Sequence, residues 1–337
     1  MNDSSFLPYY FHLHAAEARE RILAWFQRDA RRFPWRSVER AMSRPAGETI
    51  HDPYAILVSE VMLQQTQTAR VAEKLPEFLA KFPTVQALAS ASAGELIRAW
   101  QGMGYNRRAL RLQESARAVV ERYGGRFPRT VEELESLPGI GRYTASAVAC
   151  FAFGEEVPVV DVNIIRVISR IFFKCHTAAQ LLPQGTVDRV ASAVAPAGDY
   201  YRWHQGLMDL GATICTARRP ACGRCPVETL CLSAHPPDLE LFGARHAARK
   251  EPEIRGEPRR IWRGRIVETL RRAHRAMRAG EIIDALIPQG LFESFSEGER
   301  RALLDAASAL LQEGLIARAG VVREGALQED DLVGLPE

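Results

Sequence analysis

Four of the six cysteines in this sequence lie close together near residue 220. They follow the spacing Cys-x6-Cys-x2-Cys-x5-Cys, at Cys215, Cys222, Cys225 and Cys231. In a reducing compartment, four closely spaced thiols favour a metal centre over two disulfides. Thiolates are soft ligands that select zinc or an iron–sulfur cluster, and the spacing does not choose between these two. Cys150 and Cys175 lie in or beside apolar segments, so we expect both to be core residues.

A second candidate site is the turn Leu137-Pro138-Gly139-Ile140-Gly141, which directly precedes a helical pattern. Glycine lets a backbone approach a ligand closely, and the N-terminus of the following helix offers N–H groups to an anion. A helix-hairpin-helix turn holds a DNA phosphate in this way without reading base sequence. Two glycines alone are more typical of an ordinary tight turn, so the specificity comes from the complete string LPGIGRYTA.

The chain has 337 residues, which predicts about two domains and a small third one. Its hydrophobic content of 47% and charged content of 25% exclude a disordered chain, a collagen-like fibre and a disulfide-stapled miniprotein. No apolar run approaches the ~18 residues that a membrane span needs. The first thirty residues lack the apolar core and cleavage site of a secretory signal, so we expect a cytoplasmic protein.

Positive charge is unevenly distributed along the chain. The formal net charge is only +3, yet twelve Arg and Lys residues against four Glu lie between Arg245 and Arg278, a local net charge of +8. Such a stretch could meet a phosphate backbone, and we expect DNA contact through Arg255 to Arg278. A solvated basic linker explains the same composition equally well.

Helical periodicity dominates the first 235 residues, and no alternating strand pattern occurs there. We therefore predict an all-α fold for this part of the chain. The predicted helices cover residues 15–26, 54–79, 84–90, 93–101, 107–123, 131–136, 142–152 and 162–172.

The composition changes after Cys231. Residues 235–260 contain four prolines and many charges, which is typical of a linker. Helical patterns follow at 263–272, 280–286 and 296–313, and Ser296 with Glu299 forms a capping-box pattern. Residues 315–319 and Val321-Val322 resemble two short strands around Gly320. Three helices and a hairpin in this order predict a small winged-helix-like α/β unit.

Several longer strings occur in a defined order along residues 15–235. Asp52-Pro53-Tyr54 precedes SEVMLQQTQ, QGMGY, LPGIGRYTA, VVDVNIIRV and QGLMDLGATIC, and the last string runs into the four cysteines. This series resembles the helix-hairpin-helix DNA glycosylase superfamily and, within it, the adenine DNA glycosylase (MutY) family.

The resemblance implies a helix-hairpin-helix DNA glycosylase fold whose loop holds a [4Fe–4S] cluster on the four cysteines. It implies a cluster-bearing helical domain (1–50 and 158–235) and a six-helix barrel domain with the hairpin (51–157). The composition and the helical pattern after Cys231 add a linker (236–260) and the winged-helix-like domain (261–337). The expected partner is double-stranded DNA with a mismatch or an oxidised guanine. We expect a monomer that associates with the nucleoid and not with membranes.

Base excision requires an extruded base, a protonated leaving group and a stabilised cationic sugar. The resemblance makes Glu60 the acid and Asp161 the carboxylate beside the sugar. Glu60 opens an apolar helix, a setting that raises a carboxyl pKa, although a first-turn Glu by itself only complements the helix dipole. Asp161 ends an apolar run before a helix, where a role as N-cap is compatible with catalysis.

Tyr143 occupies the place where endonuclease III-like relatives carry a lysine. The lysine amine forms a Schiff base that leads to strand cleavage, and tyrosine cannot form one. We therefore predict a monofunctional glycosylase that leaves an abasic site, with Tyr143 positioning and stabilising the sugar intermediate.

Four polar residues match positions where the family contacts DNA. Gln64, Gln65 and Tyr105 match positions that probe the base stack beside the orphan base, and Gln205 matches a position that contacts the extruded adenine. Amides suit this role because they both donate to and accept from a base edge. Without the resemblance, each is equally well a surface polar group. Trp35, in FPWR, is expected to shape the pocket wall.

The sequence departs from the family pattern in three respects. Thr68 and Asn106 stand where adenine glycosylases more often have Val and a second Tyr. The stretches AVACFAFG and YGGRFPR also resemble archaeal thymine mismatch glycosylases. The C-terminal Nudix-like domain is not recognisable, and Phe295-Ser296-Glu297 is not its Phe-Ser-His loop. These departures leave the base opposite the target undetermined.

Three functions therefore stand side by side. The first is excision of adenine opposite 8-oxoguanine or guanine, which MLQQTQ and Gln205 favour. The second is a G:T or G:U mismatch thymine/uracil glycosylase. The third is a non-catalytic, cluster-bearing DNA-binding protein, which the joint presence of Glu60, Asp161 and Tyr143 disfavours.

Overall fold

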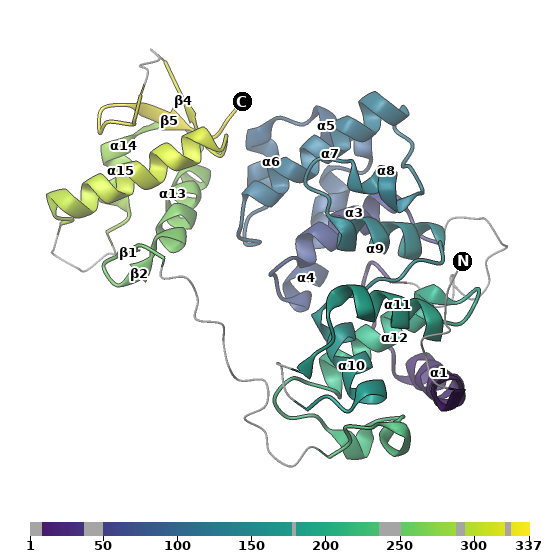
Figure 1. Cartoon of the computed structure of the whole chain (residues 1–337). Helices are drawn as coiled ribbons and strands as arrows, with labels where there is room; N and C mark the ends of the chain where they lie inside the picture. Colours follow the sequence, from purple (N-terminus) through teal and green to yellow (C-terminus); the bar gives the residue numbers. More distant parts are fainter. Residues whose placement is uncertain (1–8, 37–49, 177–179, 236–250, 288–293, 321–324) are drawn as a thin grey trace. The chain divides into compact units, whose positions relative to one another are not determined.

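The computed structural model describes residues 9–36, 50–176, 180–235, 251–287, 294–320 and 325–337 (Figure 1). The chain divides into two compact units, Met1–Glu60 with Phe127–Ala247 and Val61–Arg126 with Ala248–Glu337. The first is called unit 1 and the second unit 2 below. None of the helices in the described ranges is long and apolar enough to cross a membrane. The domain boundaries expected from the sequence stay a prediction.

Unit 1 is built from helices, and its described residues contain no strand. Its elements are α1 (Tyr9–Asp29), most of α3 (Pro53–Leu63), α8 (Val131–Glu135), α9 (Arg142–Phe153), α10 (Val162–Phe173), α11 (Gln184–Val194), α12 (Tyr200–Thr213) and the short 3-10 helices η2 (Cys222–Arg224) and η3 (Glu228–Leu230). Helix α12 packs against both α1 and α10, and α8 packs against α9. Trp203 of α12 and Phe26 of α1 are fully buried. Helices α11 and α12 lie where the sequence pattern predicted no helix.

The first part of unit 2 is also helical. It contains α4 (Thr68–Lys81), α5 (Val85–Ser90), α6 (Ala93–Ala99) and α7 (Arg107–Tyr123). The single helix predicted over residues 54–79 was wrong, because the chain leaves the helix after Leu63 and Gln65 adopts a positive φ of 57°. Thr84 caps α5, Ser92 and Glu95 form a capping box on α6, and α7 packs along α5.

The second part of unit 2 follows the predicted order of helices. Its elements are β1 (Glu253–Ile254), β2 (Glu257–Pro258), α13 (Arg259–Ala273), β3 (Met277–Arg278), α14 (Ala279–Ala285), α15 (Glu297–Gln312), β4 (Ala317–Arg318) and β5 (Leu332–Gly334). Residues 253–258, which the sequence assigned to the linker, form the β1–β2 hairpin, and Arg255 and Gly256 make its turn with positive φ angles. Residues 236–250 of the predicted linker lie outside the described ranges.

A three-stranded antiparallel sheet in the order β3-β5-β4 closes this part. Strand β4 pairs with β5 at the C-terminal end of the chain, a pairing that the sequence did not predict. The predicted strand Val321-Val322 lies outside the described residues, so its pairing with 315–319 stays a prediction. The capping box of Ser296 and Glu299 on α15 is confirmed. Trp262, Leu303 and Val333 are buried in one core that also includes Ile97 of α6.

The basic stretch of α13 and its flanks is largely neutralised within the fold. Seven of the nine arginines between Arg255 and Arg278 lie within 4.0 Å of a glutamate, and only Arg259 and Arg278 lack a carboxylate partner among the described residues. The expected DNA contact through Arg255 to Arg278 stays a prediction, and most of these arginines would have to contact DNA while paired with glutamates. Exposed pairs of this kind contribute little to stability, but they hold the arginine side chains in place.

Arg271 connects the two parts of unit 2. This residue is only 7% exposed. Its Nε donates to the Ile97 carbonyl at 3.0 Å, and one Nη donates to Asn106 Oδ1 at 2.8 Å. On the same helix, Glu268 accepts a hydrogen bond from Gln101 Nε2 at 2.7 Å. Helix α13 thus holds both ends of the segment from Gln101 to Asn106.

Arg108 joins the same segment to the end of α3. One Nη donates to the carbonyls of Val61, Met62 and Gln64. The other donates to Thr66 Oγ1 at 2.9 Å and to the Met103 carbonyl at 2.9 Å. The carbonyls at the end of a helix have no intrahelical partner, so this guanidinium satisfies groups that would otherwise lose a hydrogen bond.

Replacement of Arg108 by Met should lower the free energy of unfolding by about 2–4 kcal/mol, because several half-buried carbonyls lose their donor together. Urea unfolding measures this change. Arg107→Met is the matched control: Arg107 is the exposed neighbour and should change stability by less than about 0.5 kcal/mol. Equal effects of the two substitutions would contradict the role given to Arg108.

Candidate active site and metal centre

Glu60 lies on α3 with its side chain inside unit 1, and the residue is 6% exposed. Burial raises the pKa of its carboxyl group to about 7, since the charged form loses its hydration. The prediction that Glu60 opens a helix was wrong: α3 begins at Pro53, so Glu60 lies two turns inside it. A helix-dipole role in the first turn is thereby excluded, while the expected rise in pKa is supported by the burial.

Tyr143 and Asp161 lie next to Glu60. The Tyr143 hydroxyl donates a hydrogen bond to the Glu60 carboxylate, and Asp161 acts on Glu60 through its negative charge. Arg36 also faces Glu60 and partly offsets the rise of its pKa. Burial, together with the nearby Glu60, raises the pKa of Tyr143 well above its ordinary value, so the phenol keeps its proton. Three segments far apart in sequence thus bring the predicted acid, tyrosine and carboxylate together.

Asp161 is the N-cap of α10. Its Oδ1 accepts hydrogen bonds from the backbone N–H groups of Asn163 and Ile164 at 2.9 and 2.8 Å. Its Oδ2 accepts from the Asn163 side chain at 2.7 Å. The N-cap interpretation of Asp161 is confirmed, and these bonds fix the carboxylate in one orientation.

A chain of hydrogen bonds continues from Asp161 to the cysteine region. Arg166 donates to Asn163 Oδ1 at 2.9 Å, to the Gly211 carbonyl at 2.8 Å and to the Cys215 carbonyl at 2.8 Å. Gly211 permits this approach, because a Cβ at that position would lie 2.7 Å from the Asn163 Cβ. Sequence reasoning assigned no role to Asn163 and Arg166, although both lie within the string VVDVNIIRV.

Sequence reasoning also missed a buried ion pair between Asp209 and Arg36, the arginine whose charge acts on Glu60. Asp209 on α12 is fully buried and accepts hydrogen bonds from Arg36 at 2.9 Å and from Arg31 at 2.7 Å. A buried carboxylate with two guanidinium partners fixes their positions. Asp209 therefore positions Arg36, which in turn acts on Glu60. The only signal in the sequence was that FPWR and QGLMDLG both belong to the recognised strings.

Trp35 and Gln205 are both buried in unit 1. Trp35 is 7% exposed, and its ring stacks on that of Phe33 with the ring centroids 4.7 Å apart. Gln205 lies on α12 and is 4% exposed. Its Oε1 is buried and has no hydrogen-bond partner within the described ranges. This unsatisfied acceptor is available to a donor from a ligand.

The hairpin between α8 and α9 has the geometry expected for phosphate binding. Gly139 adopts a positive φ of 75°, a conformation that side chains rarely adopt, and Gly141 is the N-cap of α9. A side chain added to Gly141 would meet nothing within 4 Å, so the space beside the helix N-terminus is open. The N–H groups of α9 are thus accessible to an anion.

Gln64, Gln65 and Tyr105 lie in unit 2, on the two segments that Arg108 joins. Gln65 and Tyr105 have positive φ angles of 57° and 45°, and Tyr105 is 54% exposed. The Arg108 guanidinium lies 5.6 Å from the centroid of the Tyr105 ring. Strained, exposed residues of this kind persist only where the surrounding structure holds them, and they occur mostly at functional sites.

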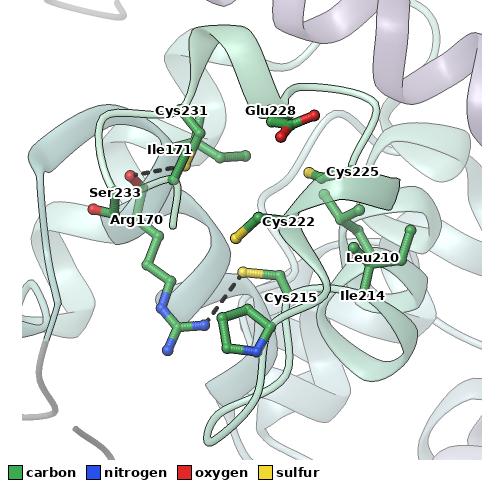
Figure 2. Close-up of a pocket in the computed structure, with 12 residues that line it drawn as sticks. Arg170, Ile171, Leu210, Ile214, Cys215, Cys222, Cys225, Glu228, Cys231 and Ser233 are labelled. Atoms are coloured by element: carbon green, nitrogen blue, oxygen red, sulfur yellow. Dashed lines mark hydrogen bonds between the residues drawn. The ribbon is translucent and has the colours of Figure 1, made fainter. Parts of the chain in front are cut away.

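The four cysteines surround one pocket in unit 1, as Figure 2 shows. Ile171, Leu210 and Ile214 form its apolar walls, and Arg170 reaches from α10 to within 3.5 Å of Cys215 Sγ. Burial raises the pKa of Cys225 to about 12 and of Cys231 to about 11, so a metal held here would supply the positive charge that favours the thiolates. Four soft donors, a nearby guanidinium and apolar walls suit an iron–sulfur cluster. Cys150 and Cys175 are buried and take no part, as expected.

Two family models match the chain. Residues 58–180 match the HhH-GPD superfamily base excision DNA repair protein, and residues 215–231 match the iron–sulfur binding domain of endonuclease III. The second match identifies Cys215, Cys222, Cys225 and Cys231 as the ligands of a [4Fe–4S] cluster. Fold and site together define a base excision DNA repair protein of the HhH-GPD superfamily.

Individual relatives narrow this class. The adenine DNA glycosylase of Rattus norvegicus is 42% identical over 254 residues, which cover 69% of this chain and 48% of the relative. That of Mycolicibacterium smegmatis is 36% identical over 293 residues, which cover 82% of this chain and 93% of the relative. The chain belongs to the adenine DNA glycosylase family. It spans about half the length of the mammalian relatives that it matches.

A solved structure supports the fold. The structure of a thermostable thymine-DNA glycosylase superposes with a TM-score of 0.58 at 32% sequence identity, covering 66% of this chain and 96% of that one. The mostly helical fold with its cysteine loop is therefore confirmed.

Gly211→Ala should lower the free energy of unfolding by about 1–3 kcal/mol, because the new methyl group forces α12 away from Asn163. Urea unfolding measures the change. Gly185→Ala in α11 is the matched control, since its new methyl group would meet nothing within 4 Å. The control should keep or slightly raise stability, as alanine favours a helix over glycine. If Gly211→Ala changed the free energy of unfolding no more than Gly185→Ala does, the close approach of α12 to Asn163 would be refuted.

Glu60→Gln should make the protein more stable than the wild type at pH 8 and not at pH 4. The wild-type carboxyl stays protonated up to a pKa of about 7 when folded, against 4.5 when unfolded. Wild-type stability is therefore lost as the pH rises from 4.5 through 7, by on the order of 3 kcal/mol. Unfolding of both proteins across this pH range measures the difference, and Glu114→Gln, at an exposed position, controls for the loss of one carboxylate. A pH-independent difference would contradict the raised pKa.

Proposed function

We propose that this protein is a monofunctional DNA glycosylase that removes adenine mispaired with 8-oxoguanine or guanine in base excision repair. The observation that carries this proposal is the buried Glu60 carboxyl with a pKa of about 7, hydrogen-bonded to Tyr143 and adjacent to Asp161. A carboxylic acid that keeps its proton near neutral pH can protonate a purine ring, while a nearby carboxylate stabilises a cationic sugar.

The reaction follows from the roles of these groups. Glu60 donates its proton to a ring nitrogen of the extruded adenine. The C1′–N9 bond then breaks, its electron pair leaves with the base, and the Asp161 carboxylate stabilises the positive charge on the sugar. Water attacks C1′, and the Glu60 carboxylate takes up the proton that this water loses. The hydrogen bonds from Asn163 and Ile164 hold Asp161 for this role.

Two further observations support adenine and a monofunctional reaction. The buried Gln205 Oε1, which lacks a partner in the described part of the chain, would accept a hydrogen bond from the exocyclic amine of adenine. Tyr143 offers no amine for a Schiff base, so strand cleavage by elimination is not expected.

The partner that fits these features is double-stranded DNA with a mismatch or an oxidised guanine. Gly139 and Gly141 would hold a phosphate at the N-terminus of α9. Gln64, Gln65 and Tyr105 would contact the base stack beside the orphan base, and Trp35 would form a wall of the base pocket. No partner subunit is needed for any of these roles, so we propose that the protein acts as a monomer.

A thymine/uracil glycosylase acting on G:T or G:U pairs is the second candidate. It is favoured by the similarity to the thermostable thymine-DNA glycosylase, at 32% identity. Thr68 and Asn106 are the first residues to examine if this function holds. Asn106 has a structural partner in Arg271, which accounts for an amide at this position without any role in base selection.

We also propose that α13, α14, α15 and the β3-β5-β4 sheet form a winged-helix-like unit. The element order and the antiparallel pairing of β3 and β4 with β5 support this assignment. A non-catalytic DNA-binding role for the whole protein is disfavoured, because such a role needs no buried carboxyl next to Tyr143 and Asp161.

Single-turnover reactions on duplexes containing A:8-oxoguanine, A:G, T:G, U:G and A:T pairs test the proposal. We expect strand breaks only after alkali, and only at adenine opposite 8-oxoguanine or guanine. The rate should fall as the pH rises above about 7, since Glu60 must be protonated. Glu60→Gln should reduce the rate by roughly 10²–10⁴-fold, as expected for loss of a general acid.

Cleavage at T:G or U:G instead of adenine would replace the first candidate by the second. Borohydride trapping of wild-type protein on DNA would contradict a monofunctional reaction, because trapping requires a Schiff base. No excision of any base by the cluster-containing protein would favour the non-catalytic role.

A further inference from the structure

Unit 2 contains a groove that the proposed active-site chemistry does not use. Its volume is about 790 Å³. Residues 104–108 and Arg111, at the start of α7, form one wall, and residues of α13 with the end of α15 form the other. The exposed ring of Tyr105 lies at its edge. The two walls are held at a defined separation by Arg271, which joins α13 to Ile97 and Asn106.

The groove is positively charged even after its internal ion pairs are counted. Six arginines and three glutamates line it. Glu251 and Glu313 pair with Arg260 and Arg263. Arg107 and Arg111 are exposed, and neither has a carboxylate partner among the described residues. These two side chains are one turn apart on α7, so they project from the same face.

Arginines are more numerous on α13, which lines the groove, than on the other long helix of the C-terminal part. Helix α13 carries six arginines and one glutamate, whereas α15 carries two arginines, two glutamates and one aspartate. Arg300 of α15 is already paired with Glu329 and Asp284. Five of the six α13 arginines are also paired with glutamates. A polyanion entering the groove would therefore meet Arg107 and Arg111 of α7, which lack carboxylate partners among the described residues.

We propose that this groove binds the phosphodiester backbone of duplex DNA, with Arg107 and Arg111 contacting phosphates. The inference rests on the proposed function, because the ligand is the duplex on which that function acts. Asn106 makes no side-chain cap on α7, because its amide oxygen accepts from Arg271. The positive end of α7 and its first two free arginines thus face the groove together. The C-terminal part forms the second wall of a DNA-binding surface without placing a recognition helix in a base groove.

The salt dependence of DNA binding by full-length protein tests this surface. The probe is a labelled duplex with an A:8-oxoguanine pair whose adenosine carries a 2′-fluoro group, which disfavours the cationic sugar and so prevents cleavage. Each lost phosphate contact lowers the slope of log K against log [salt] by about 0.9. Arg107→Ala with Arg111→Ala should lower it by about 2. The ratio of the wild-type DNA-binding constant to that of this variant should then fall by about tenfold between 50 and 200 mM salt.

Arg122→Ala with Arg126→Ala is the charge-matched control. Both residues are exposed, lie at or just beyond the far end of α7 and are not part of the groove. Arg122 is about 22 Å from Arg107 along the helix. The control should leave the slope within about 0.5 of wild type. Equal salt slopes for the two double variants would overturn the proposal. So would a lower DNA affinity of the Arg107→Ala, Arg111→Ala variant with an unchanged salt slope.

Neutral methylphosphonate linkages, placed one at a time in either strand of the duplex, locate the contact. At phosphates that the groove holds, the neutral linkage should reduce the DNA affinity of wild type several-fold. It should hardly change the affinity of the Arg107→Ala, Arg111→Ala variant. The proposal would also be overturned if, at every position, the methylphosphonate reduced the DNA affinity of wild type and of the variant by the same factor, because the two changes would then act independently. Because binding is measured without cleavage, these results do not depend on which base is excised. Failure of the proposed function therefore stays distinguishable from failure of the groove.

Discussion

Burial of one carboxyl group beside another constrains the whole of unit 1. Burial deprives the charged form of Glu60 of its hydration and raises its pKa to about 7, and the negative charge of Asp161 adds a smaller contribution in the same direction. Asp161 is held by three hydrogen bonds from the start of α10, while Tyr143 donates to Glu60. Helices α3, α9 and α10, which carry Glu60, Tyr143 and the N-cap Asp161, must therefore meet at one point. The different surroundings of Glu60 and Asp161 suit the two carboxyl groups to different roles.

Guanidinium groups make most of the connections that hold the functional segments in place. Arg166 links Asn163 to the Cys215 carbonyl, so the cluster loop and the Asp161 end of α10 share one hydrogen-bonded network. Arg108 joins the end of α3 to the Tyr105 segment, and Arg271 joins that segment to α13. A planar group with five donors suits this role, because it can satisfy several carbonyls from different elements at once.

Local patterns in the sequence predicted several features well. Gly139 and Gly141 marked the hairpin, Ser296 and Glu299 marked a capping box, and Asp161 marked a helix start, since each depends on residues within three positions. Predictions that required distant partners failed. The pairing of β4 with β5 was not predicted, α3 ends before Gln65, and α11 and α12 were not foreseen.

The sequence by itself named the candidate reactive groups and determined the metal ligands, because motif strings and cysteine spacing are properties of the linear chain. It also determined, through hydrophobic periodicity, that the residues described before position 236 are helical and contain no strand. Only the tertiary structure decided that Asp209 holds Arg36 near Glu60 and that most arginines around α13 are paired with glutamates. The physical reason is that desolvation and charge pairing depend on which side chains meet in space, and residues up to some 180 positions apart meet here. The sequence names the acid, while its neighbours set its pKa.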